Sequence, residues 1–132
     1  MKYLLALVML VNFPVMANWE LVSENQNGQT FFVDFQTLRK DGNRVKFWRL
    51  LNYPKPLDIK GLNILSLRSR TEVDCKEETS RILTLTAHSQ QYASGSELWT
   101  ETPDELDNKW TYTVPNSTMW IILQKVCKAP VR

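Results

Sequence analysis

The chain contains two cysteines, Cys75 and Cys127, and their positions limit its fold more than any other feature. An even number of cysteines in an exported chain indicates a disulfide. A disulfide that closes this 52-residue span would stabilise the fold by about 4 kcal/mol. Two distant cysteines and one histidine make a poor set of metal ligands, and the sequence identifies no basic neighbour that would activate a catalytic thiol. We therefore predict a structural disulfide, and neither a metal site nor a cofactor.

The N-terminus has the layout of a secretory signal peptide. A single lysine precedes an apolar run at residues 3–11, a proline then breaks the run, and small residues stand just before Asn18. The run is about half as long as the roughly 20 residues of a membrane-spanning helix, which argues against a membrane anchor. We expect residues 1–17 to be removed by cleavage between Ala17 and Asn18, leaving one domain at residues 18–132. No cysteine lies near this cleavage site, so we do not expect a lipoprotein.

The charge of the chain is modest. It has 16 Lys and Arg residues against 14 Asp and Glu residues, with a formal net charge of +2. This balance gives no reason to expect nucleic-acid binding, which calls for a strongly basic surface. After the signal peptide, no stretch is long and apolar enough to cross a bilayer. We therefore expect the partner to be a protein. The sequence identifies neither this partner nor the oligomeric state of the chain.

Alternating polar and apolar residues predict an antiparallel sheet of about six strands. Turn-forming residues separate the strands, most clearly at Asn27-Gly28 and Asp41-Gly42. In the segment 44–53 both phases are partly apolar, which indicates a central strand, although Arg49 interrupts one of them. The predicted strands cover residues 19–24, 30–35, 44–53, 64–75, 80–92 and 110–114, with connections at 36–40 and 57–63 and a polar, acidic loop at 97–109.

The C-terminal segment changes to a helical period. Asn116 and Ser117 are good N-cap residues, and Pro130 ends the segment. Apolar residues recur at spacings of three, four and seven and form one stripe: Met119, Trp120, Ile122, Leu123, Val126 and Cys127. Cys75 shares the apolar phase of its strand, so a bond to Cys127 would tie the helix to the inner face of the sheet. We predict an α+β fold, with an antiparallel sheet of about six strands and a C-terminal helix packed on one face and tethered by the disulfide.

No combination of residues predicts catalysis. His88 is in phase with Thr84 and Thr86 on a polar strand face, so we interpret it as a surface residue, and its neighbours form no nucleophile elbow. Carboxylates crowd the predicted loop, at Glu101, Asp104, Glu105 and Asp107. Their spacing does not match a calcium-binding EF-hand, so we interpret the segment as a solvated acidic loop, with calcium binding as the alternative. We do not expect an enzyme.

Two features are candidates for binding a partner. The first is a group of basic residues around a predicted turn: Arg39, Lys40, Arg44 and Lys46. Such a group could steer an acidic partner, or it could be the ordinary outer face of a hairpin. The second is Trp99, which lies in the predicted polar loop, where an exposed tryptophan could anchor a partner protein.

Several motifs, taken in order, resemble one known family. An N-terminal tryptophan, an Arg-Lys-Asp-Gly-Asn turn at residues 39–43 and a strand with Trp48 come first. The sequence Val73-Asp74-Cys75-Lys76, then Ser94-Gly95, and a helix after Pro115 that ends in Val126-Cys127-Lys128 follow. Together they resemble the surface-adhesin protein E family of Gram-negative bacteria. This resemblance implies a six-stranded antiparallel sheet with a C-terminal helix tethered by a disulfide.

The resemblance also implies a class of function. One member of the family is an outer-membrane adhesin that binds host matrix and plasma proteins, and most relatives are uncharacterised envelope proteins. That adhesin is a lipoprotein, whereas this chain lacks the cysteine that would be lipidated, and Met119 and Trp120 stand where the family tends to have Gly and Glu. We expect an adhesin-like, non-enzymatic binding protein of the cell envelope, either periplasmic or at the cell surface.

Two alternative functions stay open. The first is a periplasmic inhibitor of a lysozyme-type enzyme, because Tyr92-Ala93-Ser94-Gly95 looks like the Ser-Gly loop of such inhibitors. Those inhibitors carry a further tyrosine shortly after the glycine, whereas this chain has Glu97 and Leu98 there. The second is a structural envelope protein.

Overall fold

The computed structural model describes residues 17–102, 104, 106, 107 and 109–130. The predicted signal peptide lies outside the described residues except for Ala17, and Glu105 of the predicted acidic loop lies outside them too. The cleavage site and the domain boundary therefore stay predictions. The described part of the chain forms seven strands and one helix: β1 (Glu20–Glu24), β2 (Thr30–Asp41), β3 (Arg44–Ile59), β4 (Leu62–Asp74), β5 (Thr79–Gln90), β6 (Ser94–Glu101), β7 (Thr111–Tyr112) and α1 (Thr118–Lys128).

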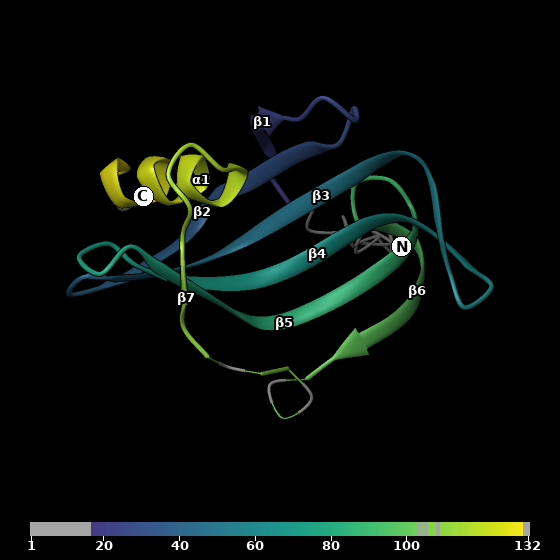
Figure 1. Cartoon of the computed structure of the whole chain (residues 1–132). Helices are drawn as coiled ribbons and strands as arrows, with labels where there is room; N and C mark the ends of the chain where they lie inside the picture. Colours follow the sequence, from purple (N-terminus) through teal and green to yellow (C-terminus); the bar gives the residue numbers. More distant parts are fainter. Residues whose placement is uncertain (1–16, 103, 105, 108, 131–132) are drawn as a thin grey trace, which may run out of the picture.

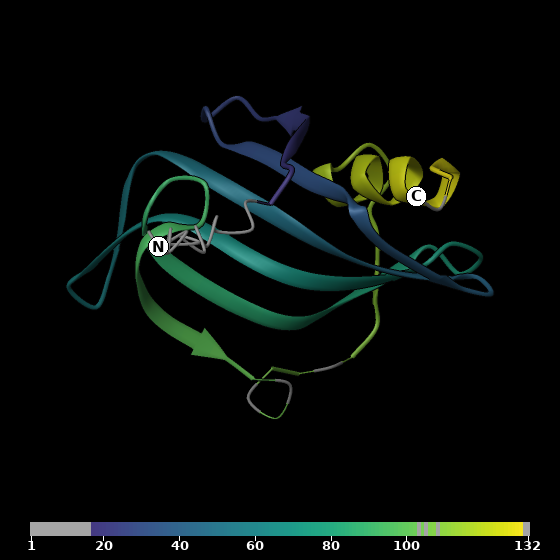
Figure 2. The same cartoon turned by 180° about the vertical axis from the view of Figure 1, so that it is seen from behind.

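The strands form one antiparallel sheet in which neighbours in space are also neighbours in sequence, in the order β1-β2-β3-β4-β5-β6. The short strand β7 lies off this path and pairs with the beginning of β5. Figure 1 and the reverse view in Figure 2 show a strongly curved sheet with α1 lying against one side of it, next to β1 and β2. The predicted α+β fold, with its antiparallel sheet and C-terminal helix, is confirmed.

Strand β2 continues through residues 36–40, where the sequence predicted a connection. Its register with β3 shifts between Asp34 and Arg39, so the strand contains a bulge. A side chain replaces ladder bonds there, because Thr37 Oγ1 donates to the carbonyl oxygen of Asp34 at 2.6 Å and accepts from the backbone N–H of Trp48 at 3.1 Å. The polar residues at 36–40, whose sequence is typical of a connection, therefore lie inside one long strand, and the Thr37 side chain makes part of its hydrogen bonds.

The predicted loop at 57–63 is also wrong. Strand β3 continues to Ile59 and β4 begins at Leu62, so the turn between them consists of Lys60 and Gly61, both with positive φ. The register of the two strands shifts between Asn52 and Leu57, around two prolines that cannot donate ladder bonds. The prolines therefore mark an irregularity within a long hairpin and not its end.

Strand β6 takes up part of the segment that was predicted as a loop at 97–109. Trp99 pairs with Ala87 of β5, and Glu101 pairs with Leu85. Because β6 is an edge strand, none of its residues is fully buried and its polar composition is that of a loop. The predicted last strand at 110–114 is reduced to the two residues of β7.

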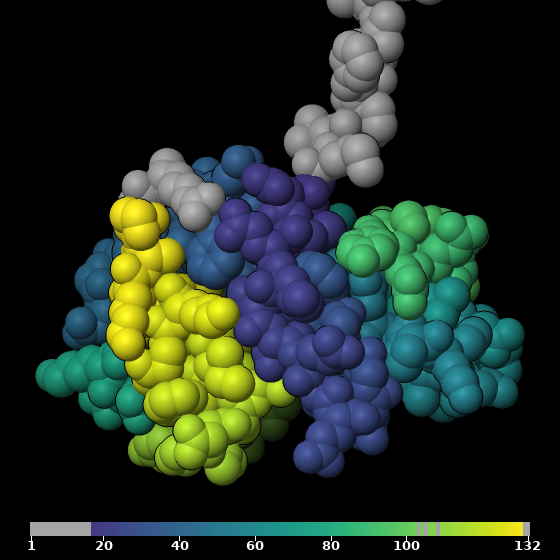
Figure 3. Space-filling view, turned by 90° about the horizontal axis from the view of Figure 1, so that it is seen from above, coloured from purple at the N-terminus to yellow at the C-terminus, as the bar shows by residue number. Residues whose placement is uncertain are grey.

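Helix α1 begins and ends as its sequence predicts. The Ser117 hydroxyl accepts a hydrogen bond from the backbone N–H of Trp120 at 3.3 Å, which caps the first turn. Lys125 and Lys128 lie in the last turn, where the helix dipole favours cations. Figure 3, which views the molecule from above, shows α1 (yellow) side by side with the N-terminal strands (purple and blue). Among the described residues, no helix is long and apolar enough to cross a membrane.

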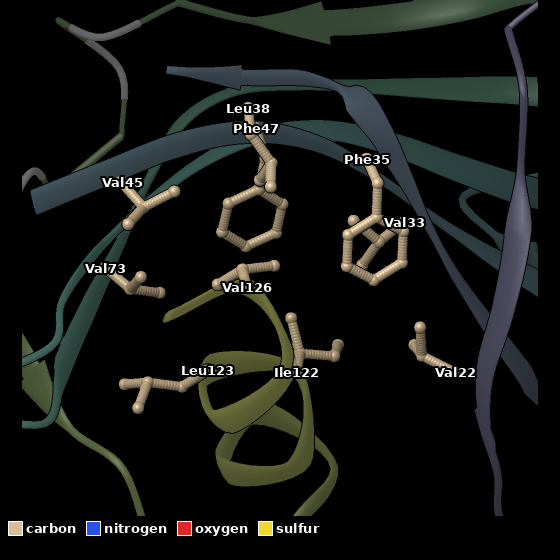
Figure 4. Close-up of a cluster of buried hydrophobic side chains, with 10 residues drawn as sticks. All are labelled: Val22, Val33, Phe35, Leu38, Val45, Phe47, Val73, Ile122, Leu123 and Val126. Atoms are coloured by element: carbon tan, nitrogen blue, oxygen red, sulfur yellow. The ribbon is translucent and has the colours of Figure 1, made fainter. Parts of the chain in front are cut away.

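The core lies between the sheet and α1. Figure 4 shows the side chains that fill it: Val22, Val33, Phe35, Leu38, Val45, Phe47, Val73, Ile122, Leu123 and Val126. Cys75 and Cys127 pack against this cluster and form the predicted disulfide, with their Cα atoms 5.9 Å apart. The predicted core-facing phase of Cys75 is confirmed, and the helix is fixed to the end of β4 by both packing and a covalent bond.

Candidate functional site

Of the basic residues near the β2–β3 turn, Arg39, Arg44 and Lys46 lie on the face of the sheet opposite α1. Val45 and Val73 face the core beneath α1, so residues one position away along each strand face the other side. On that side the strand register places four charged residues in one row across the sheet: Arg39 of β2, Lys46 of β3, Glu72 of β4 and Arg81 of β5. The fold thus brings Arg81, which is distant in sequence from the β2–β3 turn, next to the predicted basic group.

Glu72 is the buried centre of this row, with 4% of its surface exposed. Arg81 holds it with two nitrogens, since Nε lies 2.8 Å and Nη2 lies 2.6 Å from Oε1. Lys46 Nζ lies farther away, 4.0 Å from Oε2. The Arg81 contact therefore neutralises the carboxylate, while Lys46 keeps most of its charge available to solvent.

Trp110 extends the row just before β7. The guanidinium carbon of Arg81 lies 4.5 Å from the centre of the indole ring, and that of Arg44 lies 5.2 Å from it. Both distances are typical of cation–π contacts. One aromatic ring therefore orients two guanidinium groups at the same end of the sheet.

Arg39, Arg44, Lys46 and Arg81 together make what we name the basic end of the sheet. They line a surface hollow of about 250 Å³ with two carboxylates, Asp41 and Glu72. Lys40 also borders the hollow, but its Nζ approaches the carbonyl oxygens of Cys127 and Ala129 at the end of α1. The structure thus gives Lys40 a helix-capping contact, and it brings together Arg39, Arg44 and Lys46. The role of these residues in binding stays a prediction.

Trp99 does not lie with the basic end. It faces the helix side of the sheet, because it pairs with Ala87, and it is partly buried on edge strand β6. It is therefore part of a strand and not the exposed loop residue that the sequence predicted. Its role as an anchor for a partner stays a prediction, weakened by this partial burial.

His88 is buried, contrary to the prediction of a surface residue. Only 3% of its surface is exposed, and neither ring nitrogen has a hydrogen-bond partner in the described part of the chain. Burial lowers the pKa of His88 below its usual value, the positive charge of Arg68 lowers it further, and Glu97 acts in the opposite direction. The polar phase of β5 was misleading because a turn covers that face.

The covering turn joins β5 to β6. The backbone N–H of Tyr92 donates to Asn52 Oδ1 at 2.8 Å, and that of Ala93 donates to Ser66 Oγ at 3.0 Å. Tyr92, Ala93 and Gly95 all have positive φ. A Cβ atom added at Gly95 would lie 2.4 Å from Ser89 Oγ, so this position requires glycine. The turn is held rigidly, while the Tyr92 side chain remains 55% exposed.

Arg49 is a second site feature, which the sequence showed only as an interruption of an apolar phase. It lines a separate cavity of about 270 Å³ on the helix side of the sheet. Among the described acidic residues of the former loop region, Asp107 pairs with Lys109 at 3.7 Å, and both side chains are largely exposed. Within the described residues, no group of three or more His, Cys, Asp and Glu side chains is placed to hold a metal ion.

Comparison with known proteins supports the fold. The family model for surface-adhesin protein E matches residues 19–128. The chain belongs to the surface-adhesin protein E family. Crystal form II of Haemophilus influenzae protein E superposes with a TM-score of 0.64 at 16% sequence identity, over 86% of this chain and 90% of that chain. The selenomethionine form gives a TM-score of 0.63 at 15% identity, over 86% and 88% of the two chains.

A structure of protein E from non-typeable Haemophilus influenzae gives a TM-score of 0.61 at 16% identity, over 86% of this chain and 78% of that chain. At identities this low, the likeness to protein E shows a shared fold. A comparison with curated proteins finds no match. The family resemblance inferred from the sequence motifs is confirmed.

Proposed function

We propose that this protein is an exported, non-enzymatic binding protein of the bacterial cell envelope that engages a partner protein in the manner of an adhesin. Membership in the surface-adhesin protein E family supports this class of function. The basic end of the sheet is the proposed binding surface, because its positive charge is the feature that supports this choice. Its chemistry favours an acidic surface on a host matrix or plasma protein, or on another envelope protein.

The geometry of the basic end suits a contact surface. Four cations surround two carboxylates, and one of these, Glu72, is already paired with Arg81. Arg39 and Arg44 are exposed, and the Lys46 side chain is 44% exposed. Uncompensated positive charge on a rigid sheet steers an acidic partner and fixes its orientation.

The absence of an enzymatic role is part of the proposal. His88, the residue that a triad would need, lies under the β5–β6 turn with 3% of its surface exposed. A general base must reach the proton that it abstracts, and burial of this kind keeps a substrate away. This supports a binding role for the chain.

The proposed location is the periplasm or the cell surface, without a lipid anchor. The signal-like N-terminus and the disulfide between Cys75 and Cys127 support export, because disulfides form in oxidising compartments. Protease treatment of intact and permeabilised cells tests the location. Digestion on intact cells would place the protein at the surface. Digestion only after permeabilisation would place it in the periplasm and exclude a host protein as its partner.

The binding surface is tested with purified protein on immobilised matrix and plasma proteins. The double variant Arg44→Gln/Lys46→Gln removes two charges from the basic end. The double variant Lys55→Gln/Lys60→Gln removes two exposed charges from the β3–β4 hairpin and is the matched control. We expect the first to weaken binding about tenfold and the second to leave it unchanged. An equal loss in both variants would show that only the net charge matters.

A lysozyme-type inhibitor is the second candidate, and the turn between β5 and β6 favours it. The turn is rigid, projects an exposed Tyr92, and contains Ser94 and Gly95. A preorganised loop of this kind can enter the cleft of an enzyme at little entropic cost. The test is lysozyme activity with excess protein, and unchanged activity would remove this candidate.

A further inference from the structure

Arg49 places a positive charge on the core side of the sheet. It lies in β3 in the phase of Phe47 and Leu51, on the side that packs against α1, and pairs with Ser69 of β4. Its Nε donates to Thr71 Oγ1 at 2.9 Å. Burial lowers the pKa of Arg49 from 12.5 to about 10. The guanidinium is therefore still charged at neutral pH, and its side chain is partly buried.

The described residues offer this guanidinium no counter-ion. None of the ion pairs among them involves Arg49, and the contact with Thr71 is the one hydrogen bond that the structure shows for its side chain. Arg81, which also borders this cavity, differs because its charge is already paired with Glu72 at 2.6 Å. A partly buried charge without a counter-ion loses hydration that no described residue replaces, and groups with perturbed pKa values cluster at functional sites.

The cavity next to Arg49 has both polar and apolar walls. It measures about 270 Å³ and lies between the sheet and the segment that leads into α1. Hydroxyl groups come from Thr71, Ser80 and Thr111, and the apolar wall consists of Ile82, Leu106 and Met119. Met119 lies in the first turn of α1, which has no acidic residue to offset the positive end of the helix dipole. The walls thus favour a ligand with an anionic head and an apolar body.

We propose that this cavity binds a small amphipathic carboxylate, with the carboxylate on the Arg49 guanidinium and the apolar chain against Ile82 and Met119. The two terminal nitrogens of Arg49 form a planar fork that matches the two oxygens of a carboxylate, while Nε stays on Thr71. A volume of about 270 Å³ accepts a short aliphatic chain and excludes a large lipid.

Asp107 is the one described carboxylate that borders the cavity. It lies at the solvent side, because its side chain is 73% exposed and its Oδ2 is 3.7 Å from Lys109 Nζ. In the part of the chain that the structure describes, no carboxylate occupies the interior position next to Arg49. Arg81 of the basic end also borders this cavity, but Arg49 does not belong to the basic end, so the inference does not depend on the proposed function.

The test uses the folded, disulfide-bonded protein and sodium hexanoate as the probe. Hexanamide, which has the same chain but no charge, is the matched control ligand. Binding is followed by NMR through the side-chain Nε–Hε resonance of Arg49 and the methyl resonance of Met119. We expect saturable shifts of both resonances with hexanoate and at least tenfold weaker binding of hexanamide.

Variants complete the test. Arg49→Met is expected to weaken hexanoate binding at least tenfold, and Arg70→Met, which removes an exposed arginine from the opposite face, is expected to change nothing. If Arg49→Met does not fold, the comparison of hexanoate with hexanamide on the unmodified protein still decides the question. Equal binding of the two ligands, or no shift of the Arg49 resonance, would overturn the proposal. It would also be overturned if hexanoate bound only to Asp107→Asn, because Asp107 would then be the counter-ion.

Discussion

Replacing both Cys75 and Cys127 with serine removes the covalent link between α1 and the end of β4. The bond closes 52 residues, and a loop of that length restricts the unfolded chain by an amount worth about 4 kcal/mol. For a domain of this size, a loss of that magnitude corresponds to a fall in melting temperature of roughly 15 °C. We expect this fall in the double-serine variant and in the reduced protein alike.

The helix should remain docked in the variant below its melting temperature. Ile122, Leu123 and Val126 are at most 1% exposed, and burial of each stabilises the docked helix by roughly 2 kcal/mol. Together the three side chains stabilise the docked helix by more than the disulfide stabilises the fold. Removing the disulfide therefore lowers the stability mainly by releasing a constraint on the unfolded chain. The near-ultraviolet circular dichroism of the variant should therefore match that of the oxidised protein.

The assay is urea unfolding, with free thiols counted before each series. The reductant should lower the midpoint for the unmodified protein and should leave the double-serine variant unchanged, which controls for effects of the reductant itself. An unchanged midpoint in protein with two confirmed free thiols would refute the reasoning. A native-like midpoint with altered near-ultraviolet circular dichroism would show that the helix is held by the bond more than by its packing.

Three further perturbations test other parts of the structure. Glu72→Gln should destabilise the fold by about 3 kcal/mol in chemical unfolding, because it leaves Arg81 without its buried partner, whereas Asp107→Asn, at an exposed pair, should have no measurable effect. The free energy of unfolding should fall as the pH drops below about 6.5. His88 then binds a proton in the unfolded state but stays neutral in the folded state, where its pKa is lowered. His88→Gln should flatten this dependence, and an unchanged slope would assign it to another group. Gly95→Ala should cost about 2 kcal/mol through its positive φ, and an unaltered melting curve would show that the turn relaxes freely.

The elements with a regular period could be predicted from the sequence alone. The apolar stripe from Met119 to Cys127 predicted the helix. The alternation of residues before Cys75 predicted that Cys75 faces the core, and hence the disulfide. The segments at 36–40 and 57–63 could not be predicted, because strands there continue through irregular pairings. Such pairings depend on partners far away in the chain, as in the bond from Trp48 to Thr37.

The candidate site was predicted only in part, for the same reason. Arg39, Arg44 and Lys46 are close in sequence and stayed together, whereas Arg81 joins them only through the register of β4 with β5. The burial of His88 depends on a turn that bonds back to another strand. Non-local pairing of this kind leaves no local signal, although it decides which polar residues face water.

The order of the strands has a consequence for how the molecule folds. From β1 to β6, each strand pairs with the one that precedes it in sequence, so each step closes only a hairpin. Helix α1 has 11 residues, too few for a stable isolated helix in water, and it must reach back over 52 residues to Cys75. The sheet therefore acts as the template on which the helix forms, and oxidation of the two thiols becomes productive only after the last segment has docked. We therefore expect the disulfide to form last, after the helix has docked on the sheet.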